Sequence, residues 1–181
     1  MNDPDLPSDL STLDARRGSS RIVLSDDAMS YRCTRVFGAP PDRVYRASTD
    51  PVDLRVWFPS GAPPGSEMTL CESDPVRGGR YHYVMVIPEY GAMAWHGTYT
   101  DVGRPDRLDA HEWFVMGEAD PTGPPTTQSL TFEPTEDGFT LMTMDVRMPE
   151  PEDPETFEQQ AAAGLSTSLA ALDDLVSSPI A

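Results

Sequence analysis

The chain has 181 residues, of which 30 are Asp or Glu and 13 are Arg with no Lys, for a formal net charge of −17 at pH 7. A surface this acidic repels nucleic acid and anionic membranes, so the composition excludes both as main partners. No apolar run approaches the roughly 18 residues that a membrane helix needs, and no signal peptide opens the chain. We therefore expect a cytoplasmic protein with one domain and a tail.

The chain contains two cysteines, Cys33 and Cys71, which lie far apart in the sequence. We interpret both as reduced thiols in the core, and a disulfide between them is the alternative. Neither a C-x-x-C pair nor a His/Cys cluster at metal-ligand spacing occurs. The sequence therefore predicts no metal site and no cofactor.

Residues 1–20 are rich in Asp, Ser, Pro, Arg and Gly, which predicts a disordered tail. Leu6, Leu10 and Leu13 are spaced four and three residues apart, so a short helix docked against a partner subunit is the alternative. Residues 21–181 contain no internal repeat and no linker long enough to separate domains. They are predicted to form a single domain.

The first predicted elements of this domain are strands at residues 22–24 and 31–37, the second of which alternates strongly in side-chain character. A Pro-Pro pair ends the second strand, and residues 42–48 form a short amphipathic helix. Asp50 caps a second helix that has Pro51 at its first position. This second helix brings three apolar side chains to one side, namely Leu54, Trp57 and Phe58.

Six further strands follow, each bounded by turn residues, and they are joined as consecutive hairpins. Hairpins laid out in this way favour an antiparallel sheet. The predicted strands cover residues 67–73, 79–87, 92–102, 107–115, 128–133 and 139–148.

A long helix is predicted over residues 153–178, with Asp153 as its N-cap and Pro154 at its first position. Its apolar residues recur at spacings of three and four and so make one face. That face consists of Phe157, Ala161, Leu165, Leu169, Leu172 and Val176. Only a curved sheet formed by the strands is large enough to cover it, which predicts an α+β fold with the sheet wrapped around the helix. A space remains where sheet and helix part, with the two short helices as a lid, and such spaces commonly hold small molecules.

This order of elements, together with four local runs, resembles the SRPBCC superfamily, which has the helix-grip (START/Bet v 1-like) fold. Within it, the chain is most similar to the bacterial family named after the activator of the heat-shock-protein-90 ATPase. The runs are VFGAPPDRVYRA at 36–47 with TDP at 49–51 and WF at 57–58; GGRYHYVM at 78–85; GTY at 97–99 with PDRL at 105–108 and HEWF at 111–114; and GLSTSLAALDDL at 164–175. The resemblance covers about residues 30–178.

The chain departs from the family pattern at two positions that are expected to face inward. Leu169 stands where an aromatic residue is common, and Ala110 stands where a larger residue is usual. This loss of bulk predicts a larger cavity or a differently packed core. The resemblance implies a fold and a cavity but no single activity, because the superfamily includes ligand carriers, cyclases, hydroxylase domains and co-chaperones.

Glu112 is the candidate catalytic residue, because it shares the apolar side of its strand with Leu108, Ala110 and Phe114. An inward carboxylate would have a raised pKa and would suit a general acid or a ligand anchor. A structural pairing with an Arg or a Tyr hydroxyl, or a position facing water at the strand end, is the alternative.

The three histidines, His82, His96 and His111, lie on different predicted strands, and their alternation does not place them on one face. An acid/base pair of His96 or His111 with Glu112 is a further hypothesis. Because His111 and Glu112 are neighbours on one strand, their side chains point to opposite faces, which argues against that pair.

Aromatic and Met side chains form the second candidate group, since they suit either a plain core or the lining of a cavity for an apolar molecule. Together with Glu112 and two residues of the last helix, they are the candidate ligand-binding residues. The full set is Trp57, Phe58, Tyr81, Tyr83, Met85, Trp95, Tyr99, Glu112, Phe114, Met142, Met144, Leu165 and Leu169.

Three functions follow from this sequence. The first is a non-enzymatic protein that binds a small apolar or aromatic molecule. The second is a cyclase- or hydratase-type enzyme that uses Glu112 or a His as acid/base. The third is a module that interacts with a chaperone. A homodimer is a further expectation, because the edges of a sheet need covering.

Overall fold

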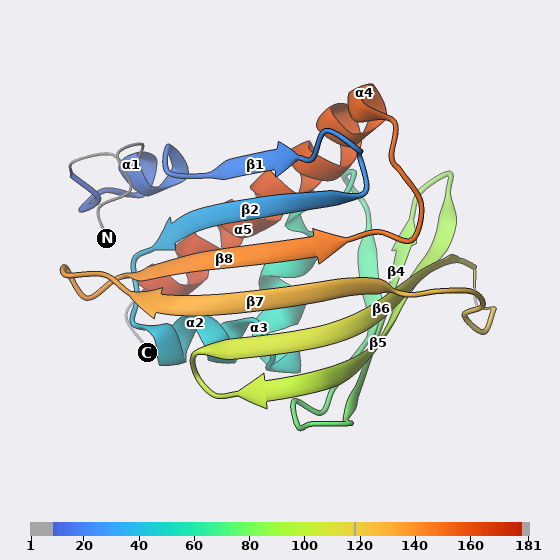
Figure 1. Ribbon diagram of the computed structural model, residues 1–181, viewed down its shortest axis with the longest axis horizontal. Helices are drawn as coiled ribbons and strands as arrows, with labels where there is room; N and C mark the ends of the chain where they lie inside the picture. Colours follow the sequence, from blue (N-terminus) through green and yellow to red (C-terminus); the bar gives the residue numbers. More distant parts are fainter. Residues whose placement is uncertain (1–8, 118, 179–181) are drawn as a thin grey trace.

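The computed structural model describes residues 9–117 and 119–178 (Figure 1). Within this part of the chain, eight strands form one antiparallel sheet in the order β1-β2-β8-β7-β6-β5-β4-β3. The chain crosses from β2 to the far edge of the sheet and returns strand by strand until β8 pairs with β2. The strands are β1 (Arg21–Leu24), β2 (Ser30–Phe37), β3 (Glu67–Ser73), β4 (Arg80–Ile87), β5 (Gly91–Gly103), β6 (Arg107–Met116), β7 (Thr126–Pro134) and β8 (Thr140–Arg147).

The helices lie between β2 and β3 and at the two ends of the described chain. Asp50 accepts a hydrogen bond from the Val52 amide and Asp153 accepts one from the Thr156 amide, so both predicted N-caps are confirmed. The helical segments are α1 (Leu13–Arg17), α2 (Pro41–Ala47), α3 (Pro51–Trp57), η1 (Phe58–Gly61), α4 (Pro154–Thr156), η2 (Phe157–Ala162) and α5 (Ala163–Ser177).

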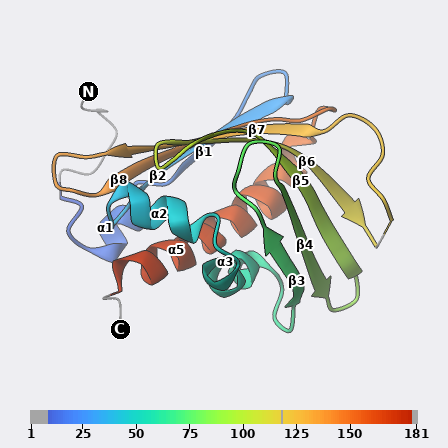
Figure 2. The ribbon, with the colours of Figure 1, turned by 90° about the horizontal axis from the view of Figure 1, so that it is seen from below.

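The sheet curves around α5. In Figure 2, strands β3 to β6 bend away from the plane of β1, β2, β7 and β8, and α5 lies in the resulting trough with α3 beside it. Two β-bulges, between Met68 and Leu70 and between Tyr99 and Asp101, interrupt the ladders of the bent half. Bulges bend a strand and increase its twist, which is how this half wraps around the helix. The predicted helix-grip architecture is confirmed.

The core lies between the inner face of the sheet and the apolar face of α5. Strand β8 shows the alternation most clearly, since Met142, Met144 and Val146 are buried while the residues between them are only half-buried. Burying a side chain of this size stabilises the fold by about 1.5–3 kcal/mol. Cys33 and Cys71 are both buried and both free, as predicted for core thiols.

The last helix departs from the regular α-helix that the sequence predicts. After the short turn of α4, η2 is a π-helical segment, and only then does α5 begin. Phe157, Leu169, Leu172 and Val176 are buried as expected, whereas Ala161 is exposed. Ala161 nevertheless lies among the residues that line the cavity between the sheet and the last helix, so its position on the inner face is kept although its side chain is accessible.

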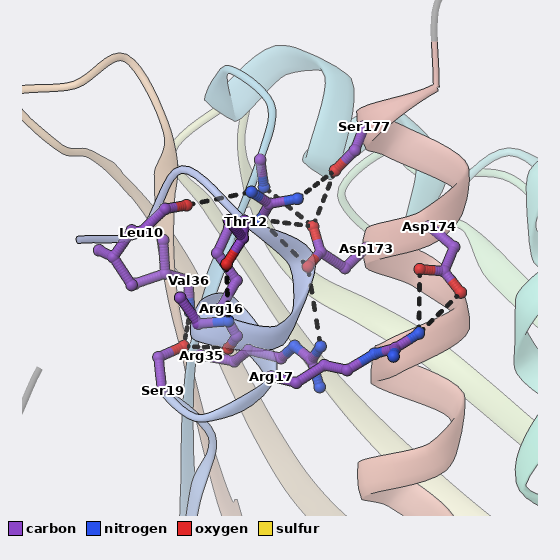
Figure 3. Close-up of polar contacts among 12 residues, drawn as sticks. Leu10, Thr12, Arg16, Arg17, Ser19, Arg35, Val36, Asp173, Asp174 and Ser177 are labelled. Atoms are coloured by element: carbon purple, nitrogen blue, oxygen red, sulfur yellow. Dashed lines mark hydrogen bonds and ion pairs between the residues drawn. The ribbon is translucent and has the colours of Figure 1, made fainter. Parts of the chain in front are cut away.

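Residues 13–17 form α1, which differs from the tail predicted for residues 1–20. Arg16 on α1 is only 4 % exposed, and its Nε donates to both carboxylate oxygens of Asp173 on α5 at 3.2 Å (Figure 3). The Arg16 Nη1 also donates to the Leu10 carbonyl at 3.0 Å. The segment at residues 10–17 is therefore tied to this chain's own last helix. Leu6, part of the predicted docked helix, lies outside the described residues.

Asp173 is the centre of this buried cluster. Besides Arg16, its carboxylate accepts hydrogen bonds from the Gly38 amide at 3.0 Å and the Ser177 hydroxyl at 2.9 Å, and it lies 3.8 Å from Nη2 of the buried Arg35. A Cβ on Gly38 would come within 2.6 Å of the Arg16 guanidinium carbon, so a larger residue there would displace the Arg16 side chain. Two cations and several hydrogen bonds thus satisfy one fully buried carboxylate.

Candidate functional site

A cavity of about 1130 Å³ lies between the inner face of the sheet, α3 with η1, and the η2–α5 helix. It is lined mainly by aromatic, Met and aliphatic side chains, with a few polar groups among them. All thirteen candidate ligand-binding residues are among those that line it: Trp57, Phe58, Tyr81, Tyr83, Met85, Trp95, Tyr99, Glu112, Phe114, Met142, Met144, Leu165 and Leu169. The structure therefore brings the whole set together around one space.

The aromatic side chains form a continuous series of ring contacts, which we call the aromatic wall. Phe58 lies at its centre, with ring centroids 5.3 Å from Trp95 and 5.7 Å from both Trp57 and Tyr83. Tyr81 stacks on Tyr83 at 5.0 Å and extends the series along β4. Edge-to-face and offset contacts of this kind add about 0.5–1.5 kcal/mol per pair beyond burial, so the rings of the wall stabilise one another.

Ser168 on α5 fixes the position of Phe58. Its hydroxyl donates to the Phe58 carbonyl at 2.9 Å and accepts from the Gly61 amide at 3.1 Å. A Cβ on Gly61 would lie 2.1 Å from the Gly164 carbonyl oxygen, so η1 and α5 approach closely only because this residue is glycine. Both Gly164 and Ser168 belong to the run in the last helix that the sequence analysis singles out.

Glu112 projects from β6 into the cavity lining, as its alternation predicts. Its Oε2 accepts a hydrogen bond from the Tyr81 hydroxyl at 2.8 Å, and the side chain of Gln128 on β7 also hydrogen-bonds the carboxylate. Burial raises the pKa of Glu112 to about 7, although these two hydrogen bonds lower it in part. The group therefore changes its charge near neutral pH.

Gly97 on β5 leaves room for the hydrogen bond between Tyr81 and Glu112. The register pairs Gly97 with Tyr81 on one side and with Glu112 on the other, so the three residues form a row across β4, β5 and β6. A Cβ on Gly97 would lie 1.9 Å from the Tyr81 ring carbon that carries the hydroxyl. Without a side chain at position 97, the Tyr81 ring lies across β5 and its hydroxyl reaches the carboxylate.

A second polar group lies at the β3 side of the cavity. The Tyr99 hydroxyl and the Ser73 hydroxyl are 2.9 Å apart and share a hydrogen bond, and Tyr83 hydrogen-bonds Tyr99. Burial raises the pKa of Tyr99, so its hydroxyl remains neutral at physiological pH. Of these residues, Tyr83 and Tyr99 line the cavity, and their hydroxyl groups are neutral hydrogen-bond partners for a ligand.

None of the three histidines is among the residues that line the cavity. His82 and His96 face each other across β4 and β5 with ring centroids 4.2 Å apart, and His82 lies between Tyr81 and Tyr83, which line the cavity. Strand alternation therefore directs His82 to the outer face of the sheet. The hypothesis of a His acid/base in this cavity is wrong for that reason.

His111 lines a different hollow, of about 810 Å³, together with polar residues of β1, β2, β6, β7 and β8. No group of three or more His, Cys, Asp or Glu side chains within residues 9–117 and 119–178 is arranged to hold a metal ion.

Sequence reasoning missed several residues that line the cavity. Gln128 and Tyr31 are polar side chains on inward strand positions, and the alternation of β7 and β2 carries the signal for both. Phe157, which the sequence predicts on the apolar face of the last helix, also lines the cavity, and its ring centroid lies 5.1 Å from that of Tyr31. Gln159 and Gln160 also line the cavity and belong to the π-helical segment η2, which the sequence does not predict.

The fold and the cavity define a helix-grip protein of the α+β class. Residues 38–177 match the family described as activator of Hsp90 ATPase homolog 1-like protein. The chain belongs to this family, which confirms the resemblance inferred from its four local runs. No protein among the curated sequences matches the chain.

Solved structures of bacterial proteins share this fold. A protein from Mycobacterium smegmatis is 23 % identical with a TM-score of 0.73, covering 89 % of this chain and 98 % of its own. One from Rhodobacter sphaeroides is 25 % identical with a TM-score of 0.71, covering 86 % of this chain and 96 % of its own. One from Chromobacterium violaceum is 27 % identical with a TM-score of 0.67, covering 83 % and 99 %. No helix within the described residues is long and apolar enough to cross a membrane.

Proposed function

We propose that this protein binds a small apolar or aromatic molecule in the cavity between the sheet and the last helix, in the cytoplasm. The observation that carries the proposal is the cavity of about 1130 Å³, lined by the aromatic wall and by Met side chains. Pockets that hold drug-sized ligands have volumes of about 300–1,000 Å³ and are mostly apolar with a few placed polar groups. Glu112, Tyr99 and Gln128 supply such polar groups here.

Native mass spectrometry of protein purified from its own host tests this proposal, because a bound molecule adds a discrete mass that denaturation removes. A titration with the neutral fluorescent probe N-phenyl-1-naphthylamine gives a second measurement. We expect saturable binding of one probe per chain, and Ala110→Leu should weaken it about tenfold, because Ala110 is a buried residue of the cavity lining.

The matched control is Ala119→Leu, since Ala119 is exposed and is not among the residues that line the cavity. It should bind the probe like the wild type. Absence of saturable binding together with absence of any retained mass would contradict the proposed function.

A catalytic function is the second candidate, and one observation favours it. A carboxyl group with a pKa of about 7, hydrogen-bonded to a Tyr hydroxyl in an apolar cavity, has the properties of a general acid or base. If the protein is an enzyme, Glu112→Gln purified from the host should retain its substrate unchanged. The wild type should convert that same molecule when it is added. Equal turnover by both proteins would remove Glu112 from that role. Chaperone interaction and homodimer formation remain predictions.

A further inference from the structure

The charged groups around the cavity are all of one sign. Glu112 and Glu152 line it, and no Arg, Lys or His does so among the described residues. A carboxylate or phosphate carried into this cavity would meet no cation and would lie near Glu112. Because an unpaired buried charge is costly, the lining disfavours anionic ligands such as fatty acids.

Glu112 has hydrogen-bond donors but no positive partner within residues 9–117 and 119–178. Tyr81 on β4 and Gln128 on β7 donate hydrogen bonds to it. The Glu112 charge raises the pKa of Tyr81 and that of Tyr31 on β2. Burial raises the pKa of both tyrosines, so they stay neutral between pH 6 and pH 8. The carboxylate therefore has the chemistry to pair with a cation supplied from outside the chain.

The aromatic wall adds a second attraction for a cation. Tyr81 both donates to Glu112 and belongs to the wall through its stacking with Tyr83. The face of an aromatic ring attracts an ammonium group within about 6 Å. A ligand with an ammonium group at one end of an apolar body would thus find complementary groups next to one another.

We propose that the cavity is selective for a hydrophobic amine, whose ammonium group pairs with the Glu112 carboxylate while its apolar body lies against the aromatic wall. This inference rests on the proposed function, since it assigns the ligand class for the same cavity. The inference predicts that the cavity binds cationic apolar molecules more tightly than neutral or anionic molecules of equal size.

Three naphthalene probes of matched shape test the inference: 1-naphthylmethylamine, 1-naphthalenemethanol and 1-naphthoic acid. Affinities are measured by isothermal titration at pH 8. We expect the amine to bind at least tenfold more tightly than the alcohol, and the acid to bind most weakly. Between pH 8 and pH 6 the amine's affinity should fall about tenfold, because a carboxyl group with a pKa of about 7 is mostly neutral at pH 6.

Two variants locate the amine site. Glu112→Gln should bring the amine-to-alcohol affinity ratio to about one, whereas Glu133→Gln, which changes an exposed carboxylate outside the cavity lining, should leave it at the wild-type value. Loss of the ratio in Glu152→Gln, with Glu112→Gln unaffected, would overturn the assignment to Glu112.

The outcomes separate the two proposals. Binding of the alcohol with no preference for the amine, or tighter binding of the acid, would overturn the amine inference while leaving the proposed function in place. Failure of all three probes and of N-phenyl-1-naphthylamine, together with the absence of any mass retained from the host, would overturn both.

Discussion

At the residue scale, Glu112 occupies a strand position whose inward neighbours Leu108 and Ala110 are apolar and buried. Tyr81 and Gln128 satisfy part of its hydrogen-bonding capacity, and Gly97 provides the space for the Tyr81 ring. An ionised carboxylate at such a place disfavours the folded state, because the unfolded chain solvates it better.

The first prediction concerns the pH dependence of stability. Burial raises the pKa of Glu112 from 4.5 to about 7. The contribution of this group to folding stability is therefore fully present below pH 4.5 and is lost as the pH rises through 7. Glu112→Gln should be more stable than the wild type at pH 8 by up to about 3 kcal/mol, and this advantage should disappear near pH 4.5. Urea denaturation at several pH values measures it. The result would be contradicted if Glu133→Gln gave the same pH profile.

The second prediction concerns Gly97. Gly97→Ala places a methyl group against the Tyr81 ring, and forcing the two apart should cost about 1–3 kcal/mol of folding free energy. The Tyr81–Glu112 hydrogen bond should break, which NMR titration of the Glu112 carboxyl detects as a further upward shift of its pKa. Gly103→Ala on the same strand is the control, since a Cβ there meets nothing closer than 3.6 Å. If the pKa of Glu112 in Gly97→Ala equalled that in the wild type, this role for Gly97 would be refuted.

At the scale of elements, the first and last helices depend on each other through Asp173. The carboxylate is fully buried on α5, and its partners come from α1, from β2 and from the residue that follows β2 (Figure 3). The nearby Arg17–Asp174 pair joins the same two helices but is exposed. Exposed pairs contribute about 0–1 kcal/mol, whereas removing one partner from a buried pair costs several times more.

The third prediction follows from this difference. Asp173→Ala leaves Arg16 and Arg35 buried without a counter-ion and should destabilise the protein by about 3–5 kcal/mol, measured by urea denaturation. Arg16→Met should cost less, because Asp173 keeps Arg35 and two hydrogen-bond donors. Asp174→Ala, in the exposed pair, should change stability by less than about 1 kcal/mol. Equal losses in Asp173→Ala and Asp174→Ala would show that burial of the pair is unimportant.

At the scale of the whole molecule, the net charge of −17 opposes the compact state through repulsion between acidic side chains. Burial of the apolar face of the last helix against the curved sheet outweighs this repulsion. The cavity exists because the same two layers part where η1, η2 and the bent strands meet.

The fourth prediction is therefore that salt stabilises this protein. Raising NaCl from 10 mM to 0.5 M shortens the screening length from about 30 Å to less than 10 Å and should raise the thermal unfolding midpoint. KCl at equal concentration should give the same rise, since screening does not depend on which monovalent cation is present. A falling midpoint, or a rise with only one of the two salts, would contradict this explanation.

The sequence by itself determined the order of the elements, their approximate ends and the inward positions of the strands. The alternation of β4 and β8, and the Asp and Pro residues at the starts of helices, act over a few residues, so a local pattern suffices to predict them. That is why the fold and the family followed from the sequence, and why all thirteen candidate residues proved to surround one space.

Only the tertiary structure decided the features that depend on distant partners. Arg16 and Asp173 are 157 residues apart, so no local pattern shows that residues 13–17 are held by the last helix. The row of Tyr81, Gly97 and Glu112 depends on the register of three strands, and the π-helical segment η2 interrupts a helix whose apolar spacing predicts a regular α-helix. These contacts arise from packing between elements, and packing has no local period that a sequence pattern could display.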